Sequence, residues 1–333
     1  MIRGHDAALA EFYDAMDGPR PPHAWIFAGP QGLGKASLAQ LLARRVLIHA
    51  VDTDAGEGHP VGKLVDAYTH PDFLLVERLP KDAKAVRDLD RREWPHDLER
   101  ARSVTVDQVR ALNAAFALKP ALSDRRVVVI DSIDDLERGG ANALLKTLEE
   151  PPAGALFLLI SHAPGRLLPT IRSRCRMLRF SALSDDVMAS VLQEKLPEAG
   201  AAEIAALVAQ GGGAPGRALA LAGLGMDEVS AALDRIAAKG DADNRERLAL
   251  AHAFSLKAAQ RRYEAFLALA PAFIAERAHE RAGAERGRAI GLWEQARDLA
   301  GHAVPGSLDP HGVTVALCGL AASLAPQGTA AKA

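Results

Sequence analysis

The sequence predicts an α/β fold for the first half of the chain and an all-helical second half, on the strength of three observations. Residues 23–43, HAWIFAGPQGLGKASLAQLLA, run from an apolar stretch through a glycine-rich turn into a segment with helical periodicity, which indicates strand, loop and helix. Continuous apolar runs predict further buried strands at residues 73–76, 127–130 and 156–160. From residue 184 onward such runs stop, and helical patterns continue to residue 325.

Length, charge and cysteine content limit the kinds of protein that this chain can be. A chain of 333 residues predicts roughly two or three domains. Its 40 Lys and Arg against 42 Asp and Glu give a net charge of -2, so any DNA contact is local or indirect. Two distant cysteines, Cys175 and Cys318, supply neither a disulfide framework nor a thiolate zinc site. Without a signal sequence or a run of about 20 apolar residues, we expect a soluble, cytoplasmic protein that enters no membrane.

The glycine-rich turn has the composition of a phosphate-binding loop. Three glycines and a lysine give the spacing G-x-x-x-x-G-K, namely Gly29, Gly32, Gly34 and Lys35. Glycines let backbone N–H groups turn inward at a helix N-terminus, and the lysine adds a full charge for phosphate. The next residue should carry a hydroxyl for Mg²⁺, but it is Ala36, and Ser37 comes one place too late. The alternative is a turn that merely joins strand to helix.

An acidic residue follows the strand predicted at 127–130. Four apolar residues and then Asp131 form a Walker B pattern, in which a buried strand presents a carboxylate beside the phosphate loop to reach Mg²⁺ through water. In hydrolysing proteins with this pattern the next residue is a glutamate that polarises water, but here it is Ser132. Asp134 and Asp135 are expected to point elsewhere.

Other charged and polar residues receive plainer interpretations. His49, His59 and His70 fit no metal-ligand spacing and are expected at the surface. Residues 77–102 interleave acids and bases, which predicts a solvated insertion. Asp107 is expected to cap the helix within residues 103–117.

Three arginines follow the strand predicted at 156–160. They are Arg172, Arg174 and Arg176, in and just after the segment LLPTIRSRC. Alone they would be ordinary surface charges. Because they follow a strand of a nucleotide-type sheet, one of them is a candidate for contacting phosphate, in this subunit or in a neighbouring one.

Four motifs together resemble those of a known family. GPQGLGKAS, VVVIDSID, NALLKTLEEPP and IRSRC occur in this order, and the chain resembles bacterial DNA polymerase III clamp-loader subunits, the delta-prime group most of all. NALLKTLEEPP followed by SRC is the most specific part. The motifs cover residues 23–180, GAPGRAL extends the similarity to about 223, and the remainder is similar only in helical character and length.

This resemblance implies a fold and a set of partners. It implies an AAA+ nucleotide-binding-like α/β domain with a parallel sheet flanked by helices, then a helical lid and an all-α collar through which five subunits assemble. The expected domains are 1–181, 182–225 and 226–325, with a flexible tail at 326–333. The implied partners are gamma/tau and delta subunits, with the sliding clamp and primed DNA contacted through the assembled complex.

The resemblance also assigns roles to particular residues. Carried over position by position, the degenerate ATP site comprises Gly29, Gly32, Gly34, Lys35, Ser37, the Walker B residue Asp131, the sensor 1 pair Ser161 and His162, and Arg217 at sensor 2. Arg174 is the arginine finger, which acts in trans on the ATP of a neighbour. A helix-surface charge is the alternative for Arg217, and the sequence favours neither reading.

Departures from the family pattern restrict the expected activity. Ala36 and Ser132 replace the Mg²⁺ ligand and the catalytic acid, so we expect little or no intrinsic ATPase activity and at most weak binding of ATP or ADP. Many relatives carry four zinc-binding cysteines that are missing from residues 44–75, so no metal is expected. The alternatives are an active gamma/tau-type ATPase, against which Ala36 and Ser132 argue, and a free-standing ATP-binding regulator, against which the SRC motif argues.

Overall fold

The computed structural model describes residues 3–56, 58–87, 89, 91–94, 98–256, 259–304 and 306–325. The expected tail at 326–333 lies outside these residues. Contacts between residues separate the chain into two compact units. Unit 1 comprises the chain up to Ala199 together with Gly211–Arg217, and unit 2 comprises Gly200–Gln210 with the chain from Ala218 onward. The division into α/β domain, lid and collar stays a prediction.

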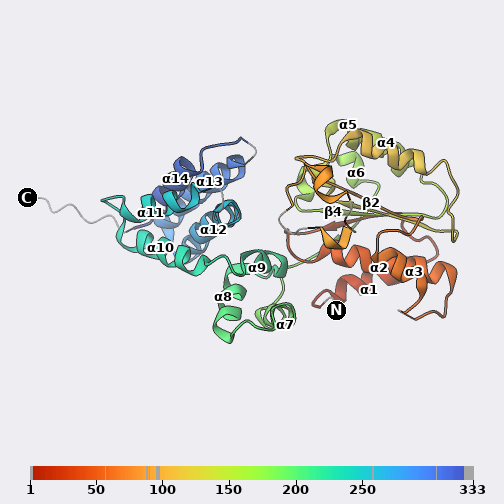
Figure 1. The fold of residues 1–333 in the computed structure, drawn as a ribbon, viewed down its shortest axis with the longest axis horizontal. Helices are drawn as coiled ribbons and strands as arrows, with labels where there is room; N and C mark the ends of the chain where they lie inside the picture. The colour runs from red at the N-terminus through yellow and green to blue at the C-terminus, as the bar shows by residue number, and fades with distance from the viewer. Residues whose placement is uncertain are drawn as a thin grey trace, which may run out of the picture. The chain divides into compact units, whose positions relative to one another are not determined.

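Unit 1 is built on a parallel five-stranded sheet (Figure 1). Its strands lie in the order β2-β3-β4-β1-β5. Their bounds are β1 Ala24–Ala28, β2 Phe73–Glu77, β3 Arg126–Asp131, β4 Ala155–Ser161 and β5 Arg176–Arg179. The first four contain the predicted apolar runs. No apolar run in the sequence indicates β5, which pairs with β1 from Trp25 opposite Arg176 to Ala28 opposite Arg179.

Helices cover both faces of the sheet, with α1, α2 and α3 on one face and α4, α5 and α6 on the other (Figure 1). Side chains alternate along each strand, so β1 contributes Trp25 and Phe27 to the first interface and Ile26 to the second. The helices are α1 Asp6–Met16, α2 Lys35–Val51, α3 Pro60–Asp66, α4 Val106–Ala115, α5 Arg138–Glu149 and α6 Pro169–Arg172. This is the α/β arrangement that the sequence predicts, with strands buried on both faces.

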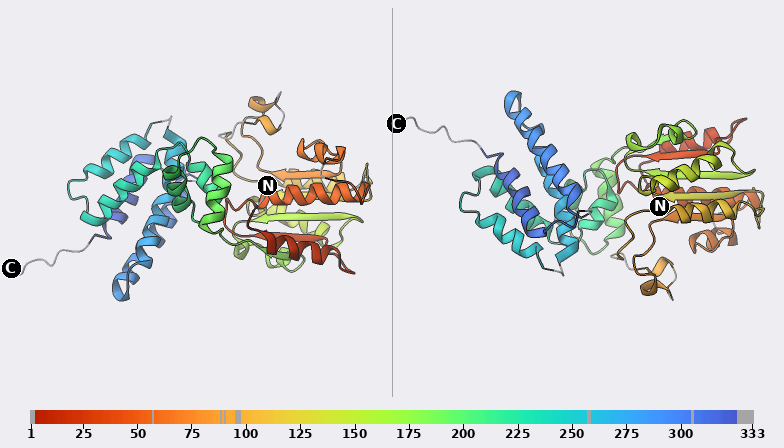
Figure 2. Two further views of the ribbon diagram at one scale, coloured as in Figure 1. Left: turned by 90° about the horizontal axis from the view of Figure 1, so that it is seen from below. Right: turned by 90° about the horizontal axis from the view of Figure 1, so that it is seen from above.

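The charged segment that follows β2 is less solvated than its composition predicts. Glu77 has only 11% of its side chain exposed and pairs with Arg91 and, at 3.0 Å, with Arg100. Arg91 also lies over the ring of Trp94, 5.0 Å from its centroid. The segment holds the short 3₁₀ turns η1 (Ala83–Val86) and η2 (Arg91–Glu93), which stand apart from the layered core in both views of Figure 2. Glu77 and its two arginine partners therefore form internal pairs, whereas Lys81, Arg87 and Glu99 are exposed, as the prediction of a solvated insertion requires.

The N-terminus of α4 shows a second difference from the sequence prediction. Thr105, not Asp107, caps this helix, and its hydroxyl accepts from the backbone N–H of Gln108 while the Gln108 side chain reaches back to Thr105. This reciprocal pair is a capping box, and it satisfies two backbone donors that a single carboxylate would not. Asp107 instead pairs with Arg110 on the exposed side of the helix.

A buried ion pair fixes the turn between α4 and β3. Asp72 is fully buried and accepts from the backbone N–H groups of Ala121, at 2.8 and 3.0 Å, and Leu122, at 2.9 Å. Arg126, 6% exposed, approaches Asp72 to 3.4 Å. The Arg126 guanidinium also donates to three carbonyls of this turn, those of Ala115, Leu118 and Lys119. Both charges are thus compensated by hydrogen bonds, as buried charges must be.

One of the three histidines expected at the surface is buried. His70 is 3% exposed, and its Nδ1 accepts from the backbone N–H of Asp72 at 3.0 Å. Burial lowers the pKa of His70, although the nearby Asp72 carboxylate opposes this. His59 is half-buried and caps α3 by accepting from the N–H of Val61, while His49 is exposed. The expectation is therefore wrong for His70.

The rest of the described chain is helical apart from two 3₁₀ turns and connecting loops. The elements are η3 Ile133–Asp135, η4 Pro164–Arg166, α7 Asp185–Lys195, α8 Ala201–Gly211, α9 Pro215–Leu221, α10 Met226–Lys239, α11 Arg245–Phe254, α12 Gln260–His279, α13 Gly283–Ala303 and α14 Pro310–Ala322. In unit 2, α14 packs against α10, α11, α12 and α13, so it forms the centre of that bundle. Among the described residues, no helix is both long and apolar enough to cross a membrane.

Candidate functional site

The glycine-rich loop leaves β1 and ends where α2 begins. Gly32 and Gly34 have φ angles of 87° and 81°, in the left-handed region that favours glycine. Gly34 is the N-cap of α2, and no side chain caps its first turn. The free amides at a helix N-terminus attract anions, so this end of α2 suits a phosphate group.

Lys35, the first residue of α2, is turned onto the loop itself. Its side chain is almost completely buried, and Nζ donates to the carbonyls of Gly29 and Pro30, at 2.6 Å each. Burial lowers the pKa of Lys35 to about 8, although the charges of Asp131 and Asp134 oppose the shift. An incoming phosphate would therefore compete with two backbone carbonyls for this ammonium group.

Two further loop carbonyls are also in contact with the chain's own groups. The carbonyl of Gly32 accepts from the N–H of Gly216 at 2.8 Å, in the first turn of α9. A Cβ on Gly32 would lie 2.8 Å from the backbone nitrogen of Arg217, so a glycine is required for this close approach. The carbonyl of Leu33 lies 2.8 Å from Nε2 of the buried His5. Contacts with Gly216 and with His5 therefore both fix the conformation of the loop.

The carboxylates at the end of β3 lie beside Lys35. Asp131 is half-buried, and its pKa is raised by burial first and then by the charges of Glu77 and Asp135. Lys35 acts in the opposite direction on that pKa. Asp134 was expected to point away from the site. Its charge nevertheless raises the pKa of Lys35, so this expectation is wrong.

Asp134 instead connects the end of β3 to the end of β4, where Ser161 and His162 lie. Its carboxylate accepts from the Ser161 hydroxyl at 3.0 Å and from the backbone N–H of His162 at 2.5 Å. His162 is half-buried, and its pKa is lowered by burial first and then by the charge of Lys35. Ser161 and His162 are thus positioned by an aspartate that sequence reasoning set aside.

The positions that normally serve Mg²⁺ and water carry unsuitable groups. Ala36 packs against the core between the sheet and α2, and Ser37 is exposed on α2. Ser132 is buried, and its hydroxyl has no hydrogen-bond partner among the residues that the structure describes. The geometry of the loop fits a phosphate, but only Asp131 of the usual Mg²⁺ set is present.

Arg217 lies on α9, whose first turn contacts the phosphate loop at Gly32. Its side chain is half-buried, and burial lowers its pKa. A purely exposed helix charge would not be desolvated in this way. This favours a location beside the loop over the surface-charge alternative, and it leaves the sensor 2 role a prediction.

Arg174 lies at the end of the sheet where the strands begin, whereas the phosphate loop lies at the end where β1 finishes. It follows α6 and comes just before β5, whose first residue pairs with Trp25 near the start of β1. The phosphate loop follows the other end of β1, about 13 Å away at 3.3 Å per residue. Arg174 is half-buried and pairs with Glu149 at 2.5 Å. Arg174 is therefore remote from the phosphate loop of its own chain.

The neighbouring Arg176 makes different contacts. It pairs with Glu11 of α1 at 3.2 Å and lies over the ring of Trp25, 5.2 Å from the centroid. Arg172 is exposed at the end of α6. The three arginines of this segment are thus distinguished by their contacts, although the sequence shows them as equivalent.

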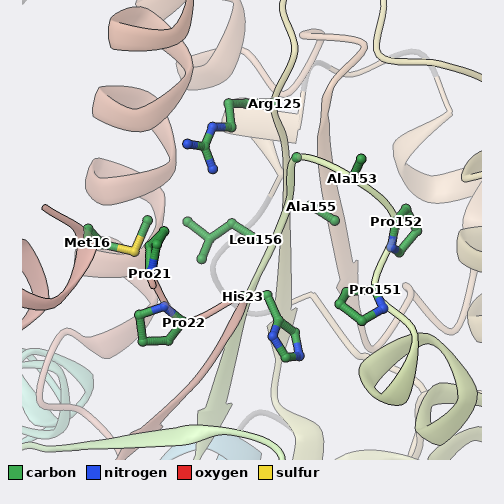
Figure 3. A pocket seen from close by; sticks show the side chains of 11 residues that line it. Met16, Pro21, Pro22, His23, Arg125, Pro151, Pro152, Ala153, Ala155 and Leu156 are labelled. Carbon is green, nitrogen blue, oxygen red and sulfur yellow. The ribbon is translucent and has the colours of Figure 1, made fainter. Parts of the chain in front are cut away.

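A cavity of about 250 Å³ lies at the edge where the strands begin (Figure 3). Figure 3 shows Met16, Leu156 and two proline pairs, Pro21 with Pro22 and Pro151 with Pro152, around it. Its walls come from residues just before β1, β3 and β4, whereas the phosphate loop follows the far end of β1. The cavity is therefore separate from the loop. Among the described residues no cluster of His, Cys, Asp and Glu could hold a metal ion.

Comparison with known proteins identifies the family of this chain. A sequence profile described as "DNA polymerase III, delta subunit" matches residues 4–184, more than half of the chain. The chain belongs to this family. The delta' subunit of DNA polymerase III from Pseudomonas aeruginosa is 34% identical over 210 residues, which cover 63% of this chain and 58% of that protein.

Proteins with other names are also similar to this delta-prime-like chain. A gamma/tau subunit from Mycobacterium tuberculosis is 29% identical over 218 residues, covering 64% of this chain and 34% of that protein. A solved gamma subunit-related protein from Thermotoga maritima is 16% identical with a TM-score of 0.44, covering 95% of this chain and 98% of that one. The chain therefore matches little more than half the length of the Pseudomonas relative and about a third of the gamma/tau subunit.

The contacts of two residues in this delta-prime-like chain could not be read from the sequence. Asp134 was present in VVVIDSID, but the sequence does not reveal that it reaches Ser161 and His162. Glu149 belongs to NALLKTLEEPP, the motif most specific to the family, and the structure brings it to Arg174. In both cases the missing information is which loops the parallel sheet brings together.

Proposed function

We propose that this chain is the delta-prime subunit of a DNA polymerase III clamp loader and acts in the cytoplasm. In this proposal it hydrolyses no ATP itself and serves as an assembly subunit that helps to load the sliding clamp onto primed DNA. Its direct partners are gamma/tau and delta subunits, and the clamp and DNA are contacted through the complex. Family membership supports the proposal, as does similarity to delta' and gamma/tau subunits.

The non-hydrolysing role rests on the contacts of Lys35 and on the residue that follows it. Lys35 is engaged by two carbonyls of its own loop, and no hydroxyl follows it in the sequence. Phosphoryl transfer depends on a metal ion that bridges phosphate oxygens and on a residue that orients water. Here Ala36 and Ser132 occupy those two positions. Weak binding of ATP or ADP by the loop amides and Lys35 is compatible with this proposal.

Arg174 is proposed to act in trans, as the arginine finger for ATP bound by a neighbouring gamma/tau subunit. Arg174 lies where the strands begin, and its own phosphate loop lies where β1 ends, which supports this assignment. A guanidinium keeps its charge and forms two parallel hydrogen bonds to phosphate oxygens as charge shifts in the transition state. Such arginines accelerate phosphoryl transfer by roughly 10³ to 10⁵.

Assembly is the first test of the proposed function. The chain is co-expressed with gamma/tau and delta subunits from the same organism, and the complex is isolated by size-exclusion chromatography. We expect a defined complex that contains all three. A chain that stays free of both partners while they bind each other would overturn the proposal, and strong ATP turnover by the chain alone would favour the gamma/tau-type alternative.

The arginine finger is tested in that reconstituted complex. We expect Arg174→Ala to lower the ATPase rate stimulated by clamp and primed DNA, by no more than the share of the one site that loses its finger. Arg176→Ala is the matched control, because that residue pairs with Glu11 and stacks on Trp25. If only Arg176→Ala lowers the rate, the wrong arginine has been named. If neither does, the trans mechanism is wrong.

A further inference from the structure

Arg174 and its partner Glu149 are each attached to a well-buried anchor. Glu149 directly follows Leu148, which is 1% exposed, and Arg174 comes three residues after Ile171, also 1% exposed. Both anchors belong to the same hydrophobic cluster, on the face of the sheet that α4, α5 and α6 cover. The backbones that carry the two charges therefore have little freedom to move relative to each other.

The Arg174 side chain is itself fixed by three acceptors of its own chain. One terminal nitrogen donates to the carbonyl of Thr170 at 2.7 Å and lies 3.3 Å from the Ser173 hydroxyl. The other contacts a carboxylate oxygen of Glu149 at 2.5 Å. A guanidinium carries more N–H groups than these acceptors use. With 31% of the side chain exposed, the remaining groups are available to a molecule outside the chain.

We propose that Glu149 is a positioning residue for Arg174. In this proposal its carboxylate holds the guanidinium in one orientation before the neighbouring subunit binds, so that the unused N–H groups face a phosphate of that subunit's nucleotide. The inference rests on the finger role proposed above for Arg174. It adds a residue, at the end of α5, whose only effect on catalysis passes through another side chain.

The energetics make this role separable from folding. Glu149 has 47% of its side chain exposed, and an ion pair this accessible to water contributes little to the stability of the fold. Replacing the carboxylate therefore leaves the fold intact. The effect on catalysis is larger, because a transition-state contact depends steeply on the placement of the reacting groups, and we expect a loss of about tenfold at the one dependent site.

The test is a double-variant cycle in the reconstituted complex, with Glu149→Gln, Arg174→Ala and both together. The measurements are kcat and KM for ATP in the presence of clamp and primed DNA. A tenfold loss removes about nine-tenths of the turnover at one site, so Glu149→Gln should reproduce about nine-tenths of the Arg174→Ala loss. We expect kcat to fall with KM unchanged, and Glu149→Gln to have no further effect once Arg174 is alanine.

The adjacent Glu150→Gln is the matched control, because this residue is also exposed and carries the same charge at the end of the same helix. It should leave kcat unchanged. If Arg174→Ala lowers kcat and Glu149→Gln does not, the positioning role is wrong and the finger stands. An increase in kcat with Glu149→Gln, or a further loss in the double variant, would also overturn the positioning role. If Arg174→Ala has no effect, both proposals fail.

Discussion

Replacing Asp72 by asparagine removes the charge of a fully buried carboxylate while keeping the shape of the side chain. In the native protein the two carboxylate oxygens accept from the N–H groups of Ala121 and Leu122 and face Arg126. An amide offers one oxygen where the carboxylate offers two, so its NH₂ group meets either a backbone donor or the guanidinium. Arg126, 6% exposed, then keeps a buried positive charge without its counter-charge.

Breaking a buried ion pair from one side costs about 3–5 kcal/mol. Whole domains are stable by only about 5–15 kcal/mol, so this change removes a large part of the total for unit 1. With an m-value of about 2 kcal/mol per molar urea, the unfolding midpoint should fall by about 2 M.

The assay is urea unfolding followed by tryptophan fluorescence, to which the buried Trp25 of unit 1 contributes. Asp107→Asn is the matched control, because that side chain is 82% exposed and its pair with Arg110 lies on the surface. We expect the control to change stability by less than about 0.5 kcal/mol. A midpoint for Asp72→Asn that shifts no further than that of Asp107→Asn would refute the reasoning.

Three other predictions concern the loop and the metal content. The isolated chain should release negligible phosphate from saturating Mg-ATP, since Ala36 and Ser132 replace the groups that serve Mg²⁺ and water, and turnover that Lys35→Ala abolishes would contradict this. Elemental analysis should find no bound zinc, because two distant cysteines cannot form a tetrahedral site, and about one zinc per chain would be the opposite result. Lys35 should lose its proton near pH 8 in nitrogen-detected NMR, because burial disfavours its charged form, whereas an unfolded chain keeps that proton to about pH 10.5. The free energy of unfolding should therefore rise with pH between these two values, and a Lys35 midpoint above 10 would count against the burial argument.

The sequence was sufficient for the elements whose signals are local. Four strands are continuous apolar runs buried on both faces, a pattern that periodicity detects. β5 was missed because it has four residues, and its two arginines leave only Leu178 fully buried. It lies at the edge of the sheet, beside β1 alone, so half-exposed side chains are tolerated there.

The start of α4 carries a sequence signal that distinguishes Thr105 from Asp107 as the capping residue. Asp107 and Thr105 are both good capping residues, but only Thr105 has a glutamine three places later. The same spacing rule that supports the phosphate loop would have placed the helix start correctly.

In the candidate site, too, features set by neighbouring residues could be predicted, whereas contacts between distant segments could not. The glycine spacing indicates the left-handed turns at Gly32 and Gly34, because a phosphate loop is a local structure. The links from Asp134 to His162 and from Glu149 to Arg174 join segments that are 25 residues or more apart. Such contacts depend on strand order, which no single motif specifies. The burial of His70 was missed for the same reason.

The pairing of β1 has a consequence for the protein during its synthesis. β1 is the first strand made, yet its neighbours in the sheet are β4 and β5, the last two. Trp25 and Phe27 must therefore wait until Arg179 has left the ribosome before both edges of their strand are covered. At roughly 5–20 residues per second this delay lasts roughly 8 to 30 s. During that time the most aromatic strand of unit 1 is a target for chaperones and for other nascent chains.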